Sequence, residues 1–300
     1  MKLFDCTLYY DEDLILDARL NILNKYFDKF IICESKYSHS GREKKLNFDI
    51  KKFSDFKKKI IYIVDDMEPN GLIYDINKEG KIEKPEHYRY NAIKRIAQQR
   101  NKLIDAVNQD ADSEDYIFYS DNDEIPNIEN FDKDNEKSKI IIFEQKLFYY
   151  KFNLLCDQIL WYGTRAIKKK NLQTFELLRQ IKPKKYNFYR LDTLFKKDKF
   201  IDLKIIKNGG WHFTRVLTPE EIHQKELDAE HHDEYRASNK NPDKIRYLIN
   251  NRLIDHDHKA DSKSSKYEKE FKLKLINTNE LPQYIQNNQD KYKDFLDLNS

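Results

Sequence analysis

The sequence is poor in the residues that mark specialised chain architectures. Its 300 residues include six Gly, seven Pro and three Cys. So little Gly and Pro excludes a fibrous or low-complexity chain. No apolar stretch approaches the roughly 20 residues that a membrane helix needs, and 55 basic residues are nearly balanced by 52 acidic ones. We therefore expect a globular protein with no membrane span and no nucleic-acid partner.

The cysteines give no sign of a disulfide framework. Cys6, Cys33 and Cys156 lie far apart and are odd in number. Cys6 and Cys33 fall in apolar runs, so we expect them to be buried free thiols, as in a protein of a reducing compartment. The N-terminal run MKLFDCTLYYDEDL meets an acid by position 5 and has no signal-peptide pattern. These features predict a soluble, cytoplasmic protein.

Familiar nucleotide-binding motifs are also missing. The sequence has no P-loop, no GxGxxG and no GxSxG. It has instead an alternation of strands and helices over its first 125 residues, in which each expected strand is almost entirely apolar. Such strands are typical of a parallel sheet that helices cover on both faces. The sequence thus predicts an α/β fold.

Polar residues follow the expected strands at the point where each strand ends. The endings are CES at 33–35, VDD at 64–66 and SDNDE at 120–124. The carboxyl ends of parallel strands lie at one edge of the sheet, where ligands bind in such folds. We therefore expect an acidic crevice along that edge.

The C-terminal part of the chain is predicted to be mainly helical. The run NGGWHF predicts a tight turn at Gly209–Gly210 inside an interrupted strand. The run TPEE at 218–221 has the pattern of a capping box with Pro in the first turn. Beyond 235 the chain is highly charged. We predict one domain over residues 1–235, and a helical extension over 236–300 that packs on the same domain.

Asp121 and Asp123 are the first candidates for chemistry. If the strand stays extended, both carboxylates lie on one face ~7 Å apart, with Asn122 on the other face. Two such carboxylates can flank Mg²⁺ or Mn²⁺ that a substrate phosphate also ligates. The alternative is an ordinary polar turn, because Asp, Asn and Pro all favour turns.

Two arginines and one histidine bear on this choice. A helix is expected from Pro85 to about Val107, and Arg89 and Arg100 fall on its apolar stripe. An Arg on a buried face needs an anionic partner, which is either a strand-end acid or a substrate phosphate. His212 stands between Trp211 and Phe213 in a strand. It is a core residue unless a metal is present, in which case it is a candidate ligand.

Several segments together resemble one enzyme family. The segments are FDKFIICESKYSHSGREKKLNF, YSDNDEIPN, FYYKFN followed by WYGT, NGGWHF and AEHHDEY, in that order. They are similar to glycosyltransferase family 17, which includes β-1,4-mannosyl-glycoprotein 4-β-N-acetylglucosaminyltransferases. The resemblance spans roughly residues 2–235, and LPQYIQNNQDKYKDFL also looks like the family's C-terminal segment.

The resemblance implies a GT-A-type fold, in which a Rossmann-like mixed sheet is flanked by helices and carries a metal-binding DxD motif. It implies inverting transfer of a sugar, GlcNAc, from a UDP-sugar with Mn²⁺ (or Mg²⁺) as the cofactor. Asp121 would face the nucleotide ribose and the metal, and Asp123 would ligate the metal directly. His212 lies where many such enzymes have a metal-binding histidine.

The resemblance also implies residues that bind the nucleotide sugar. Glu34 and Ser35 end a core strand where such folds contact the base and ribose. Arg42 and Arg100 would approach the diphosphate, and Gly163 belongs to the WYGT run that resembles the sugar-site loop.

The general base is left open by the sequence. A carboxylate must deprotonate the acceptor, and between the DxD and His212 the acids that lie in suitable segments are Glu144, Glu176 and Asp192. Glu176 is preferred because it follows the WYGT run.

The acceptor does not carry over from the resemblance. Animal members of the family carry a membrane anchor, whereas we expect none in this chain, and the Lys-rich segment 165–205 is hard to align. We expect a glycan or polysaccharide-precursor acceptor. A sugar-nucleotide-forming nucleotidyltransferase, or an inactive glycan-binding module, remains an alternative.

Overall fold

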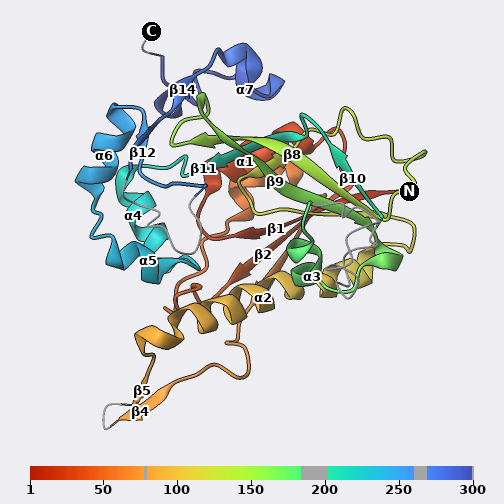
Figure 1. The fold of residues 1–300 in the computed structure, drawn as a ribbon. Coiled ribbons are helices and arrows are strands. Elements are labelled where there is room, and N and C mark those ends of the chain that lie inside the picture. The colour runs from red at the N-terminus through yellow and green to blue at the C-terminus, as the bar shows by residue number, and fades with distance from the viewer. Residues whose placement is uncertain (78–79, 184–201, 260–268, 299–300) are drawn as a thin grey trace, which may run out of the picture.

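A ten-stranded mixed sheet forms the centre of the protein in the computed structural model, which describes residues 1–77, 80–183, 202–259 and 269–298. Its main strand order is β3-β2-β1-β6-β9-β8-β11-β7, with β10 also paired to β8 and β14 to β9. Figure 1 shows the sheet flanked by helices. The predicted Rossmann-like α/β class is confirmed.

The first half of the sheet is parallel, as its continuous apolar runs predict. It contains β1 (Leu3–Tyr9), β2 (Lys29–Ser35), β3 (Ile60–Asp65) and β6 (Tyr116–Tyr119). All residues of β1 and β6 are buried. The carboxyl ends of these strands therefore meet at one edge, as expected for a ligand site.

The second half of the sheet is mixed. It contains β7 (Glu124–Pro126), β8 (Ile140–Tyr149), β9 (Leu154–Lys168), β10 (Leu203–Ile206) and β11 (Gly210–Thr214). Both β10 and β11 run parallel to β8, so the glycines at 209–210 break one strand rather than reverse it. Gly210 has φ +131°, and a Cβ there would lie 2.7 Å from the Asn127 nitrogen. Only glycine tolerates this approach of β11 to β7.

Helices cover both faces of the sheet. Helix α1 (Asp13–Leu23) packs on one face, with α7 (Gln283–Asn287) beside it. Helices α2 (Pro85–Asp110) and α3 (Phe175–Gln180) cover the other face. The predicted helix from Pro85 is thus confirmed, with its C-terminal end three residues beyond the expected one. Short 3₁₀ turns lie at Ile50–Phe56, Lys169–Asn171, Thr278–Glu280 and Lys293–Phe295.

Three further helices gather at one end of the sheet (Figure 1). They are α4 (Pro219–Asp228), α5 (His232–Ala237) and α6 (Pro242–Asn250). The predicted capping box at 218–221 is present, because Thr218 and Glu221 bond each other's backbone N–H. The extension after 235 also contains the short strands β12 (Leu253–Ile254), β13 (Phe271–Lys272) and β14 (Lys274–Leu275). Through β14 it adds to the edge of β9.

A small hairpin of β4 (Asp75–Asn77) and β5 (Gly80–Ile82) projects beyond the start of α2 (Figure 1). All three cysteines are buried free thiols, as predicted for Cys6 and Cys33. Burial raises the pKa of Cys6 and Cys33.

In the part of the chain that the structure describes, no helix is both long and apolar enough to cross a membrane.

Candidate active site

The acidic run after β6 forms a tight turn. The strand ends at Tyr119, and the Glu124 N–H donates to the Asp121 carbonyl at 3.0 Å. The extended geometry considered from the sequence is therefore not observed, because Asp121 and Asp123 lie in a turn and not along a strand. Both carboxylates nevertheless line the same cavity, and Asn122 between them lines it as well.

A buried arginine holds this turn in place. The guanidinium of Arg19 donates to the carbonyls of Asp121 at 3.3 Å, Asn122 at 3.2 Å and Glu124 at 2.9 Å. It also donates to both carboxylate oxygens of Asp5, at 2.6 and 2.7 Å. Arg19 has no exposed surface, so these bonds are made away from water, where their loss is most costly.

A second arginine links the acids of the turn to α3. Arg179 donates to Asp121 Oδ2 and to Glu124 Oε1, both at 2.8 Å. Glu124 is fully buried and also accepts the indole N–H of Trp161 at 2.6 Å. Burial raises the pKa of Asp121, but Arg179 and Arg100 outweigh burial and hold that pKa well below its usual value. Asp121 is therefore ionised at neutral pH.

Asp123 faces His212 across the cavity edge. Asp123 Oδ2 lies 3.4 Å from His212 Nε2, because β11 pairs with β7 directly after the turn. Burial lowers the pKa of His212, but the charge of Asp123 outweighs burial and leaves that pKa raised. Burial likewise raises the pKa of Asp123, and His212 outweighs it and leaves that pKa lowered. The two side chains thus stabilise each other's charged form.

The residues around Asp123 fit a divalent cation. Adjacent ligands at 2.1–2.2 Å from one ion are about 3 Å apart, close to the Asp123–His212 separation of 3.4 Å. Within the described ranges, His212 Nδ1 and both amide atoms of Asn122 are buried without a hydrogen bond. No three His, Cys, Asp or Glu side chains of the described chain converge on one point. An ion held here would take its other ligands from substrate and water.

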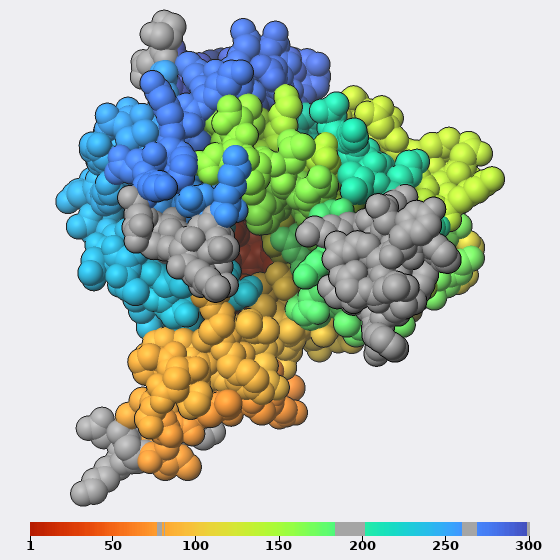
Figure 2. Space-filling view, viewed as in Figure 1, coloured from red at the N-terminus to blue at the C-terminus, as the bar shows by residue number. Residues whose placement is uncertain are grey.

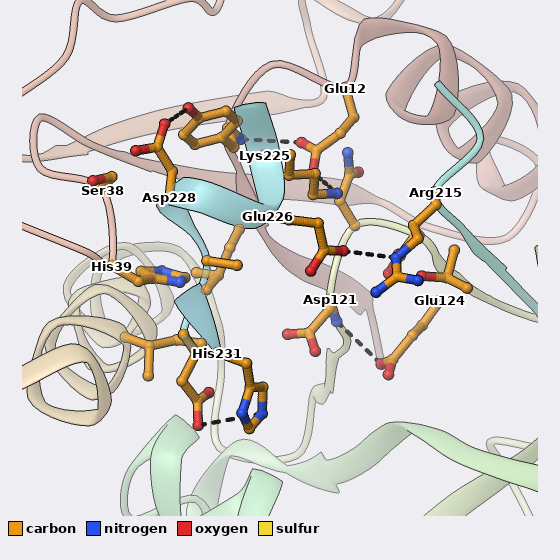
Figure 3. Close-up of a pocket in the computed structure, with 18 of the residues that line it drawn as sticks. Glu12, Ser38, His39, Asp121, Glu124, Arg215, Lys225, Glu226, Asp228 and His231 are labelled. Carbon is orange, nitrogen blue, oxygen red and sulfur yellow. Dashed lines mark hydrogen bonds and ion pairs between the residues drawn. The ribbon is translucent and has the colours of Figure 1, made fainter. Parts of the chain in front are cut away.

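The cavity in front of the turn has a volume of about 520 Å³, within the usual range for ligand pockets. Figure 2 shows it as a hollow with the red N-terminal segment at its floor, between the cyan helices and the green segment. Tyr10 and Ser35 from strand ends line one part, and residues of α4, such as Lys225, line another. Figure 3 shows Glu124 and Arg215 on one side of the cavity and His39 and His231 on the other.

Of the two predicted nucleotide-binding residues at the end of β2, one lines the cavity and the other is buried. Ser35 lines the cavity. Glu34 is fully buried, and its carboxylate accepts from Lys44 at 2.5 Å, from the Asn47 N–H at 2.7 Å and from Tyr62 at 2.8 Å. Glu34 therefore anchors the segment that follows β2.

The predicted diphosphate arginines also have protein partners. Arg42 donates to Asp228 Oδ1 at 3.0 Å, and Asp228 lines the cavity whereas Arg42 is not among the described lining residues. Arg100 donates to Glu176 at 2.8 Å and to the Tyr119 hydroxyl at 3.0 Å, and it lies 3.9 Å from Asp121. Of the two arginines, only Arg100 is thus brought to the acid turn.

Gly163 lies directly behind the turn. A Cβ at this position would lie 2.8 Å from Glu124 Cδ, so the absence of a side chain lets β9 approach the buried acid. Of the three candidate bases, Glu144 and Glu176 are described, and neither is among the described residues that line the cavity. The Glu176 carboxylate is bonded to Arg100, and Glu144 accepts the Tyr162 hydroxyl at 3.1 Å. Asp192 lies outside the described residues.

The sequence of the protein matches one known enzyme family. The sequence model for Glycosyltransferase family 17 matches residues 1–182, which is more than half of the chain, and the protein belongs to that family. The match includes Asp121 and Asp123 but ends before His212 and the α4–α5 region. Among curated proteins, no match is found.

Proposed function

We propose that this glycosyltransferase is a metal-dependent, inverting enzyme that transfers GlcNAc from UDP-GlcNAc to a glycan or polysaccharide-precursor acceptor. The observation that carries the proposal is the pair of Asp123 and His212, which lies at the edge of the cavity beside the unpartnered amide of Asn122. Buried polar atoms without partners are rare in folded proteins, so a ligand is expected to bind them.

The sheet end of the cavity suits the donor. Asp123 Oδ2 and His212 Nε2 would hold Mn²⁺ or Mg²⁺, and the bound ion would stabilise the negative charge on the departing diphosphate. Asp121 keeps an exposed fraction of 34% while Tyr119 and Arg179 fix its position. A fixed, ionised carboxylate is a good acceptor for a ribose hydroxyl.

The walls of the cavity suit a nucleotide and a sugar. Tyr10, Tyr37 and Trp161 supply aromatic surface, and Ser35 and Gln99 supply hydroxyl and amide groups. Aromatic surface combined with polar groups at fixed positions is typical of small-molecule sites. Tyr10, Ser35 and Tyr37 lie at the carboxyl ends of the parallel strands β1 and β2, where such folds bind ligands. Gln99 lies on α2, and Trp161 lies on the antiparallel strand β9.

A nucleotide screen by thermal unfolding tests the proposal. UDP and UDP-GlcNAc should raise the midpoint by about 5 °C at a hundredfold excess over the dissociation constant, and only when Mn²⁺ is present. A preference for nucleoside triphosphates would instead indicate a nucleotidyltransferase. The absence of any response to nucleotides would contradict the proposal and indicate a glycan-binding module.

A further inference from the structure

Almost every carboxylate that lines the cavity is held by a cation or a hydrogen-bond donor. The pairs are Glu12 with Lys225, Asp121 with Arg179, Asp123 with His212, Glu124 with Trp161 and Arg179, Glu226 with Arg215, Asp228 with Arg42, and Glu234 with Arg89. Figure 3 shows the Glu226–Arg215 and Glu12–Lys225 pairs at the cavity wall. A carboxylate bound in this way has few lone pairs left with which to accept a proton.

Glu230 is the exception among the described residues that line the cavity. It lies in the turn between α4 and α5 and makes no hydrogen bond within the described chain. The one ion-pair contact described for its carboxylate is with His231 Nε2, at 4.0 Å. Its side chain is 27% exposed, so the carboxylate is shielded from bulk water yet open to the cavity.

The charges that face Glu230 come from several elements. Burial raises the pKa of Glu230 most strongly, Asp121 and Glu176 raise it further, and Arg100 and Arg89 on α2 lower it. On its own segment the charged neighbours are His231 and Glu234. The sum is a pKa above the usual value for Glu. A carboxylate with a raised pKa is the stronger base when it is ionised, which is the property that a general base needs.

We propose that Glu230 is the general base of the transfer, acting on the acceptor hydroxyl. The inference rests on the proposed function. The acceptor oxygen forms a bond to the anomeric carbon as the bond from that carbon to the diphosphate oxygen breaks. The bonding electron pair leaves with UDP, and the hydroxyl proton moves to the Glu230 carboxylate. The acceptor would then enter from the α4–α5 side, opposite the acid turn that binds the donor.

The competing candidate, Glu176, is already engaged. Its Oε2 accepts from Arg100 at 2.8 Å and its Oε1 from Gln180 at 2.7 Å, and it is not among the described residues that line the cavity. To act as a base, Glu176 would first have to leave the Arg100 guanidinium. Glu230 needs no such rearrangement, because it lines the cavity and makes no hydrogen bond within the described chain.

The test compares Glu230→Gln with Glu176→Gln and Glu230→Asp in the full chain. UDP release from UDP-GlcNAc is measured with Mn²⁺, both with water alone and with p-nitrophenyl hexosides as acceptors, and UDP affinity is measured by calorimetry. Glu230→Gln should lower UDP release by about 10²–10⁴-fold, which is the usual contribution of a general base. It should change UDP affinity by no more than about threefold, because it removes no donor contact. Glu230→Asp should restore part of the rate, and Glu176→Gln should stay within about tenfold of wild type.

A pH profile separates a base from a merely structural residue. The acidic limb of kcat/KM in the wild type should lie above the usual Glu range and disappear in Glu230→Gln. Unchanged UDP release in Glu230→Gln would overturn the inference and leave the proposed function standing, as would a loss of UDP affinity equal to the loss of rate. A wild type that releases no UDP from any UDP-sugar would overturn the proposed function itself, and the inference with it.

Discussion

The acid turn and the α4–α5 turn border the same cavity but hold their carboxylates in opposite ways. In the acid turn, Glu124 has no exposed surface and is bonded by Arg179 and Trp161, while Arg19 ties the backbone. In the α4–α5 turn, Glu230 makes no hydrogen bond within the described chain. A group that binds a donor must be fixed in advance, whereas a group that accepts a proton must have a free lone pair. The difference supports the proposed division, in which the acid turn binds the donor and the α4–α5 turn accepts the proton.

The largest effect is expected from removing the support of the acid turn. Arg19→Met leaves Asp5 buried without a cation and frees three backbone carbonyls. Breaking a buried ion pair on one side should lower the free energy of unfolding by about 3–5 kcal/mol. The exposed Arg246 is the control, since Arg246→Ala should stay within about 0.5 kcal/mol. Equal denaturation midpoints for the two variants would show that the turn does not depend on Arg19.

The next effect concerns the proposed metal ligand. Asp123→Asn keeps the size of the side chain but removes the charge that faces His212. UDP release from UDP-GlcNAc should fall by about 10²–10³-fold, as for other losses of transition-state charge stabilisation. Stabilisation by UDP with Mn²⁺ should disappear as well. The exposed Asp134 serves as the matched control, and Asp134→Asn should leave both measurements unchanged. Retained Mn²⁺-dependent stabilisation in Asp123→Asn would remove this residue from the site.

A smaller effect is expected from crowding the turn from behind. In Gly163→Ala, the new Cβ would meet the side chains of Gln145 and Glu124, both of which are fully buried. Overpacking of this kind should lower the free energy of unfolding by about 1–3 kcal/mol. UDP affinity should fall too, because Glu124 shares Arg179 with Asp121. A variant with normal stability and normal affinity would mean that the turn is less rigid than its contacts indicate.

The smallest effect concerns the other wall of the cavity. Burial lowers the pKa of His39 to about 4, against about 6.5 in an unfolded chain. The unfolded state therefore binds more protons between these values, so stability rises with pH from about 4 to about 6.5 and is lost as the pH falls through this window. In His39→Gln, unfolding measured across this window should show a shallower pH dependence. An identical slope would contradict the lowered pKa of His39.

The parallel half of the fold follows from sequence patterns because each strand and helix carries its own periodicity. The apolar run of β6 and the Pro85 start of α2 are both found where the patterns place them. The strands β12 to β14 are each only two residues long, which is too short to show any alternation. Strand β14 forms through its pairing with β9, and no local sequence pattern predicts this pairing.

The sequence predicts the position of the acid turn but not its backbone conformation. The run SDNDE marks its position, yet the conformation depends on Arg19, which lies far away in sequence. Arg19 could have been found, because it lies on the apolar stripe of α1 with Leu16, Leu20 and Leu23, as Arg100 does on α2. Arg179 and Glu230 could not have been found from the sequence. The contacts of Arg179 with the acid turn, and the lack of a hydrogen bond at Glu230, are defined only by the tertiary structure.

The most direct test of the division between donor binding and proton transfer is the affinity for UDP, measured by calorimetry with and without Mn²⁺. The measurement compares wild type, Asp123→Asn and Glu230→Gln. We expect wild type and Glu230→Gln to bind UDP equally well and only with Mn²⁺. We expect Asp123→Asn to lose that binding. If Glu230→Gln loses UDP as Asp123→Asn does, or if neither variant loses it, then donor binding and proton transfer are not divided between these two turns.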